Sequence, residues 1–171
     1  MYQKSSKIFL LLLLVVLGAN AQRYNIVIGP DLSLPTGNST NQSPIGFGGY
    51  LKGEVGLNQK FSITGSGGVV SFLGRKFIGP RTASSSSIPV KMGFKYYTER
   101  SFYFEGQLGA VFPLNGIAEN RFAWSPGAGT FIRSRKSKNE LDIGFRYEGW
   151  TRTGTTTFSF FSLRAGYAFN L

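Results

Sequence analysis

The most informative stretch of the chain is IPVKMGFKYY, residues 88–97. In an extended strand successive side chains point to opposite sides, so this stretch divides cleanly between two faces. One face carries Lys91, Gly93 and Lys95. The other face is entirely apolar and consists of Ile88, Val90, Met92, Phe94 and Tyr96. Period-two alternation of this kind predicts a β-strand with one polar and one apolar side.

The same separation of faces recurs along the chain. In residues 140–150, for example, Leu141, Ile143 and Phe145 oppose Asp142 and Arg146. We count eight alternating segments in all, at 25–34, 45–56, 61–72, 88–97, 102–112, 122–134, 140–150 and 158–170. The second, fourth and sixth connections are tight, and the odd ones are mostly longer and rich in Gly, Ser, Thr, Asn and Pro. This organisation is typical of an all-β, eight-stranded antiparallel up-and-down barrel.

The charged residues fall on one face of these segments, five of each sign. They are Asp31, Lys52, Glu54, Lys91, Lys95, Glu105, Asp142, Arg146, Glu148 and Arg164. If the barrel spans a membrane, each cation on the lipid side near the midplane would cost about 2–4 kcal/mol. Five would cost on the order of 10–20 kcal/mol, as much as the whole stability of a typical domain. We therefore expect a transmembrane barrel with a lumen charge network.

The N-terminus has the pattern of a secretory signal peptide. Lys4 and Lys7 precede ten apolar residues, 8–17, and a small-residue site ends at Ala21. Ten residues reach only about 15 Å as a helix, half the roughly 30 Å of a hydrocarbon core. We predict a cleaved signal peptide at 1–21 and a single barrel domain at 22–171.

Composition narrows the possible classes of protein. The chain has 23 Gly and 24 Phe plus Tyr in 171 residues, which disfavours helices. It has no Cys, so no disulfide or lipidated cysteine contributes. Its formal charge of +11, or +9 after loss of Lys4 and Lys7, favours acidic surroundings such as anionic lipid or phosphate-bearing glycolipid.

Two local features carry separate expectations. Pro30 and Pro126 lie inside predicted strands, where proline removes a ladder donor, so we expect a bulge or shortened pairing at each. Several aromatic residues lie near predicted strand ends, where interfacial girdles occur in membrane barrels. We expect such a girdle from Tyr96, Tyr97, Tyr103, Trp124, Tyr147 and Trp150.

The sequence LPTG at 34–37 is followed by IGFGGYLKGE at 45–54. These two stretches resemble the opening hairpin of the outer-membrane protein β-barrel domain family of Gram-negative bacteria. Later strands of the family are matched by the stretches at 88–97, 104–109, 122–127 and 145–149. The chain ending, with Tyr167, Phe169 and Leu171, looks like the C-terminal signal that is read by the barrel-insertion machinery. The resemblance implies an outer-membrane barrel with both termini periplasmic.

The residue types available for chemistry are few. The chain has no His, which removes Ser-His-Asp and Cys-His catalysis and His-based metal sites. We therefore expect no catalytic, cofactor-binding or metal-binding residues, and a structural or surface-interaction role in the cell outer membrane. An eight-stranded barrel is filled by its own side chains, so an open porin is not expected.

The expected partners are outer-membrane lipid and glycolipid, together with the insertion machinery, around a monomeric protein that binds no nucleic acid. The outer-loop cations that could hold glycolipid phosphates are Arg75, Lys76, Arg81, Arg121 and Arg152. Two alternatives stay open at this stage. One is a secreted, soluble lipocalin-like barrel that binds a small apolar ligand and has its charged face in water. The other is an outer-membrane lipid-modifying enzyme.

Overall fold

The computed structural model describes residues 23–41, 43–74, 84–99, 101–114, 119–133, 139–152, 154 and 156–171. The predicted signal peptide at 1–21 lies outside these residues, as do the outer-loop cations Arg75, Lys76 and Arg81. No helix in this described part of the chain is long and apolar enough to cross a membrane.

Eight strands account for most of the described residues. Their bounds are β1 Tyr24–Pro35, β2 Gly46–Gly56, β3 Phe61–Phe72, β4 Ser85–Tyr97, β5 Phe102–Pro113, β6 Arg121–Arg133, β7 Glu140–Thr151 and β8 Phe158–Asn170. The predicted segments agree with these bounds to within one residue, except that β4 begins three residues early. Ser85 and Ser86 extend β4 because they pair with Phe72 and Ser71 of β3.

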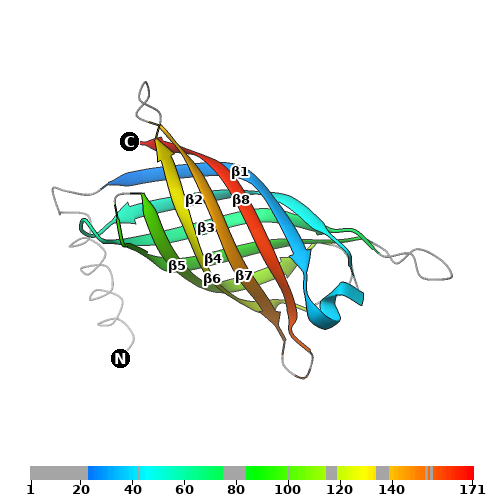
Figure 1. Cartoon of the computed structure of the whole chain (residues 1–171). Helices are drawn as coiled ribbons and strands as arrows, with labels where there is room; N and C mark the ends of the chain where they lie inside the picture. Colours follow the sequence, from blue (N-terminus) through cyan, green and yellow to red (C-terminus); the bar gives the residue numbers. More distant parts are fainter. Residues whose placement is uncertain are drawn as a thin grey trace, which may run out of the picture.

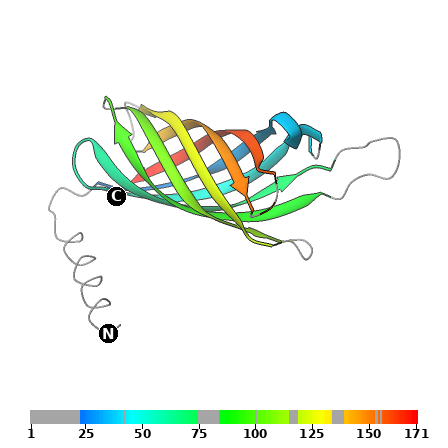
Figure 2. The same ribbon diagram turned by 90° about the horizontal axis from the view of Figure 1, so that it is seen from below.

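The strands form a closed barrel in which each pairs antiparallel with the next and β8 pairs with β1 (Figure 1). This confirms the predicted up-and-down topology. The start of β1 and the end of β8 lie at one end of the barrel together with the turn at 57–60 between β2 and β3, and we call this the turn end. The 3-10 helix η1 (Gly37–Asn41) lies at the opposite end, which we call the loop end (Figure 2).

The prolines interrupt single ladders without shifting any register. Pro30 pairs with Gly49 of β2, but the β1–β8 ladder omits Gly29 and Pro30 and resumes in the same register at Asp31. Pro126 likewise pairs with Gly106 of β5, and the β6–β7 ladder skips it. The expected shortened pairing is present at both sites, and neither has a bulge. Because proline lacks one donor, loss of pairing on one side is sufficient.

Glycines allow aromatic rings to lie across the strand pairs. The indole of Trp124 covers its cross-strand partner Gly149, where an added Cβ would come within 2.3 Å of the ring. On the lumen side Tyr103 covers its partner Gly129, and an added Cβ there would lie 2.4 Å from the phenol oxygen. Such contacts shield the bare backbone of glycine and fix the cross-strand pairing. They account for part of the unusual glycine and aromatic content.

The outward face of the barrel is a continuous apolar surface. No outward position in the eight strands carries a charged residue. Highly exposed outward side chains within the strands include Met92, Phe94, Leu108, Ile28, Leu51 and Phe145. Monomeric soluble proteins rarely expose contiguous apolar patches of more than a few hundred Å². A surface that is apolar all round the barrel therefore matches a hydrocarbon environment.

The first loop is more ordered than its Gly-, Ser- and Pro-rich sequence indicated. Residues Gly37–Asn41 form η1, which rests against the start of β8. The hydroxyl of Ser39 accepts a hydrogen bond from the Ser159 backbone N–H at 2.9 Å, and the Thr36 N–H donates to the Ser159 carbonyl. The loop is thereby anchored at the rim of the barrel.

Candidate functional site

All ten charged residues of the predicted lumen network lie inside the barrel. Each is at most 4% exposed, and up to six strands separate them in sequence. Their positions follow from the alternation of each strand, since residues of one parity point inward. β3 and β6 contribute no charge but supply buried hydroxyls, from Ser62, Thr64, Ser66 and Ser125. The ten residues form three connected groups along the barrel.

The central group is built around Lys52 and Arg146. The Lys52 ammonium lies 2.6 Å from an Asp142 carboxylate oxygen and 3.8 Å from Glu105. The Arg146 guanidinium donates to Glu105 at 2.9 Å. It also donates to the Gln107 amide oxygen at 2.7 Å. Two cations and two carboxylates therefore neutralise one another across the lumen.

The second group lies toward the loop end. In this group one lysine and one arginine donate to the same carboxylate. Glu148 accepts from Lys91 and, at 3.3 Å, from Arg164. Arg164 Nε also donates to Asp31 at 2.5 Å. The Trp150 indole N–H donates to the second oxygen of Glu148 at 3.2 Å. Glu148 is thus the most highly connected carboxylate of the network.

The third group lies toward the turn end. Lys95 donates to Glu54 at 2.5 Å, and the Tyr97 hydroxyl donates to the other oxygen of the same carboxylate. The Lys95 ammonium also lies over the Tyr103 ring, 4.1 Å from its centroid. Cation–π contacts in such a desolvated site are worth about 2 kcal/mol.

Two apolar clusters close the network at either end. The loop-end cluster consists of Val70, Phe72, Val111, Ala123, Trp150, Phe158 and Phe160. The turn-end cluster consists of Val27, Tyr50, Tyr97, Tyr103, Phe131 and Ala168. The space beside Asp31, Lys91 and Arg164 amounts to about 10 Å³, which is room for one water molecule. The lumen is therefore filled with side chains.

These clusters correct the expected aromatic girdle. Tyr97, Tyr103 and Trp150 are buried inside the barrel rather than placed at the membrane interface. The reason is the alternation of side chains along a strand. Each of the three residues lies an even number of positions from a lumen charge on its own strand, so it points into the lumen as that charge does. Trp150, for instance, lies two residues after Glu148. The other three residues, Tyr96, Trp124 and Tyr147, have outward parity, and Tyr96 is among the exposed apolar residues.

Both mouths of the barrel are basic. At the loop end, Arg121 begins β6 and Arg152 directly follows β7, one position beyond the paired residues Phe122 and Thr151. The two arginines therefore face each other across neighbouring strands. Glu119 lies 3.5 Å from Arg152. At the turn end, Arg23, Lys60 and Arg133 surround a cavity over Tyr97.

The C-terminal strand carries the residues of the expected insertion signal on its outer face. Tyr167 and Phe169 point outward, and their rings pack edge to face at 4.9 Å. Leu171 is the last residue, and its backbone N–H donates to the Tyr24 carbonyl at 3.0 Å. Within the described ranges, no group of His, Cys, Asp or Glu has an arrangement that could hold a metal ion.

Neither a family model nor any curated protein sequence matches the chain. Solved structures, however, share its fold. The attachment invasion locus protein Ail of Yersinia pestis, in a complex with the heparin analogue sucrose octasulfate, aligns with a TM-score of 0.58 at 19% identity, covering 86% of this chain and 99% of Ail.

Two proteins of Pseudomonas aeruginosa are also similar in structure. The outer-membrane protein OprG aligns with a TM-score of 0.55 at 10% identity, covering 91% of this chain and 99% of OprG. The N-terminal β-barrel domain of OprF aligns with a TM-score of 0.52 at 11% identity, covering 85% and 97% of the two chains. The chain thus has the eight-stranded barrel fold of Gram-negative outer-membrane proteins.

Proposed function

We propose that this chain is an integral outer-membrane β-barrel with a structural or surface-interaction role and no catalytic activity. The observation that carries the proposal is the distribution of charge: an outer face without charges encloses a lumen in which five cations neutralise five carboxylates. When bulk water is excluded, each charge in the interior needs an oppositely charged partner, and each of the ten has one.

The arrangement argues against the two alternatives. A soluble barrel that binds an apolar ligand needs an apolar cavity and a polar exterior, whereas here Lys52 and Glu105 are buried and Met92 and Phe94 are exposed. An enzyme that uses lumen carboxylates needs one that can reach a substrate. Each of the five is held in an ion pair beneath an apolar cluster.

We further propose that the turn end is periplasmic and that the chain acts as a monomer. Short periplasmic turns and longer outer loops are the rule in such barrels. The outward aromatic side chains of Tyr167 and Phe169, with Leu171 at the chain end, then present a C-terminal signal to the insertion machinery in the periplasm.

Fractionation of cells that express the full chain tests this proposal. We expect the mature protein, without residues 1–21, in the outer-membrane fraction, with faster migration on unboiled gels because the folded barrel resists detergent. Protease added to intact cells should cut within the longer, odd-numbered connections at the loop end. It should not cut the tight, even-numbered connections at the turn end. Recovery as a detergent-independent soluble monomer would contradict the membrane location, and cleavage at the turns would reverse the orientation.

The surface-interaction role is proposed to involve the anionic groups of outer-leaflet glycolipid. Arg121 and Arg152 form a pair of like charges on neighbouring strands, and the one carboxylate that contacts this pair among the described residues, Glu119, lies 3.5 Å from Arg152, so the pair keeps a net positive charge that favours an anion. A guanidinium binds phosphate or sulfate oxygens through parallel N–H donors. The complex of Ail with a sulfated sugar shows that a barrel of this fold binds such a polyanion.

Replacing Arg121 and Arg152 together by alanine is expected to weaken binding to purified lipopolysaccharide by at least about tenfold, since a hydrogen bond to a charged group contributes about 1.5–3 kcal/mol. Biolayer interferometry on the mature protein in nanodiscs measures this. As a control, Asn58→Asp at the turn end lowers the net charge by one, against two for the double variant, and leaves the loop end unaltered, so it should bind as the unchanged protein does. A control that weakens binding by half as much as the double variant on a logarithmic scale would mean that only net charge matters.

A further inference from the structure

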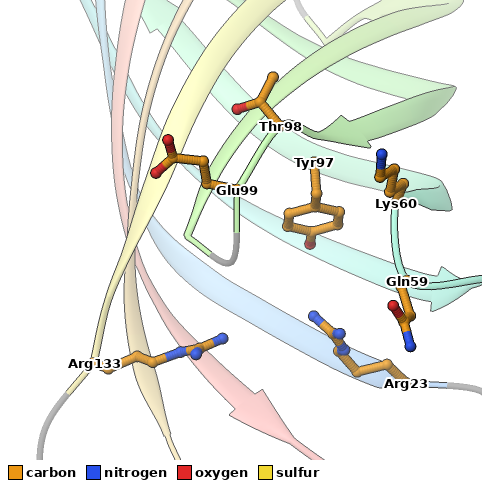
Figure 3. Close-up of a pocket in the computed structure, with 7 residues that line it drawn as sticks. All are labelled: Arg23, Gln59, Lys60, Tyr97, Thr98, Glu99 and Arg133. Atoms are coloured by element: carbon orange, nitrogen blue, oxygen red, sulfur yellow. The ribbon is translucent and has the colours of Figure 1, made fainter.

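The turn-end mouth contains a cavity of about 510 Å³, lined by Arg23, Gln59, Lys60, Tyr97, Thr98, Glu99 and Arg133 (Figure 3). We call it the turn-end cup. Small-molecule sites typically measure about 300–1,000 Å³, so the cup has the size of a ligand site. None of its residues belongs to the ten-residue lumen network, and it lies at the opposite end from Arg121 and Arg152.

The parity of the strands explains how these side chains meet. Arg23 lies two residues before the buried Asn25, and Lys60 lies two residues before the buried Ser62. Arg133 similarly lies two residues beyond the buried Phe131. Each of these three cations is therefore at the next inward position past the end of the lumen packing. The barrel itself, rather than a single flexible loop, brings these cations together around one opening.

The floor of the cup is closed. Tyr97 is buried and stacks with Phe131 at 6.3 Å, and its hydroxyl donates to Glu54 below. The Arg23 guanidinium lies over the Tyr97 ring, 5.8 Å from its centroid. Because side chains fill the lumen beneath, the cavity ends at this floor. It is a binding site in shape and not the entrance of a channel.

The charge of the cup is positive. The lining of the cup contains three cations, Arg23, Lys60 and Arg133, and one carboxylate, that of Glu99. Among the described residues, neither Arg23 nor Lys60 has a carboxylate within 4.0 Å. The Arg133 Nε donates to Glu140 at 2.5 Å, which orients its guanidinium. The guanidiniums of Arg23 and Arg133 point toward one another across the mouth, and the Glu99 carboxylate points away from them (Figure 3).

We propose that the turn-end cup binds a phosphate group, carried either by a soluble phosphorylated compound or by a phospholipid headgroup. The Arg23 guanidinium offers parallel N–H donors to phosphate oxygens, and the Arg133 guanidinium, held by Glu140 through its Nε, adds positive charge on the facing side of the opening. Lys60 adds a third positive charge on the adjoining turn. The volume leaves room for a group of the size of glycerol attached to the phosphate. The proposal is independent of which way the barrel faces.

Isothermal titration of the mature protein in uncharged maltoside micelles with sn-glycerol 3-phosphate tests the soluble source. We expect binding at low salt that glycerol alone does not show. Arg23→Ala should weaken it at least about tenfold, Arg23→Lys less so because the charge remains, and Glu99→Gln should tighten it. Asn120→Asp, which lowers the net charge equally at the loop end, is the matched control and should leave the affinity unchanged.

Nanodiscs test the lipid source with the same variants. If the ligand is a headgroup, adding phosphatidylglycerol to phosphatidylcholine discs should raise the unfolding temperature of the unchanged protein and of Asn120→Asp but not that of Arg23→Ala. Retention of the faster unboiled gel band shows that each variant is folded, and Lys60→Ala provides a second variant in the cup. The proposal is overturned if neither source binds, or if Arg23→Ala behaves in both arms like Asn120→Asp.

Discussion

Replacing Glu148 by glutamine is expected to destabilise the barrel by about 3–5 kcal/mol, the cost of removing one partner from a buried ion pair. Glu148 accepts from Lys91, Arg164 and the Trp150 indole. Glutamine cannot neutralise the charges of Lys91 and Arg164. Its amide N–H groups are donors, and they would face the N–H donors of these two cations. Arg164 retains Asp31 at 2.5 Å, so the uncompensated charge falls mainly on Lys91.

Urea unfolding in lipid vesicles, followed by the unboiled gel shift, measures this loss. The control is Glu140→Gln, because its partner Arg133 is 48% exposed, although the Glu140 side chain itself is 12% exposed. Water screens a pair with one exposed partner, so the control should lose much less stability than Glu148→Gln.

A compensating change identifies the buried charge as the cause. Adding Lys91→Met to Glu148→Gln removes the stranded ammonium, and neighbouring residues of one network typically couple by about 0.5–3 kcal/mol. The double variant should therefore be more stable than Glu148→Gln alone. If Glu148→Gln is no less stable than Glu140→Gln, the lumen network does not contribute to stability as described.

Strand parity explains why so much of this architecture was predictable from the sequence. A strand has a period of two, so one correctly assigned residue such as Lys91 fixes the direction of every neighbour on that strand. The ten lumen residues were identified in this way. The same rule would have placed Tyr97 and Trp150 inward. The girdle interpretation rests on distance from the strand ends and ignores parity, so it is wrong for Tyr97, Tyr103 and Trp150, which lie in the lumen.

The sequence alone does not predict which cation pairs with which carboxylate. Which cation meets which carboxylate depends on the stagger between strands that are distant in the chain. Lys95 and Glu54, for example, lie on β4 and β2, with β3 between them. Alternation within a strand carries no information about that stagger. The turn-end cup was missed for the same reason, because its residues come from four separate segments and no single motif unites them.

Introducing arginine at Met92 is the second change for which we expect a large effect. Met92 lies near the middle of β4, points outward and is 68% exposed, between Gly65 of β3 and Leu108 of β5. In a membrane, an outward arginine near the midplane costs about 2–4 kcal/mol. On a water-exposed surface the same substitution would change stability by no more than about 0.5 kcal/mol.

The comparison with Leu57→Arg makes this a test of depth in the membrane rather than of side-chain chemistry. Leu57 is also exposed, but it lies in the β2–β3 turn, where an arginine costs only about 0–1 kcal/mol. In vesicle unfolding, Met92→Arg should therefore lose substantially more stability than Leu57→Arg. Equal stability of the two variants would place the outer face in water, and the apolar band around the barrel would then need a protein partner to cover it.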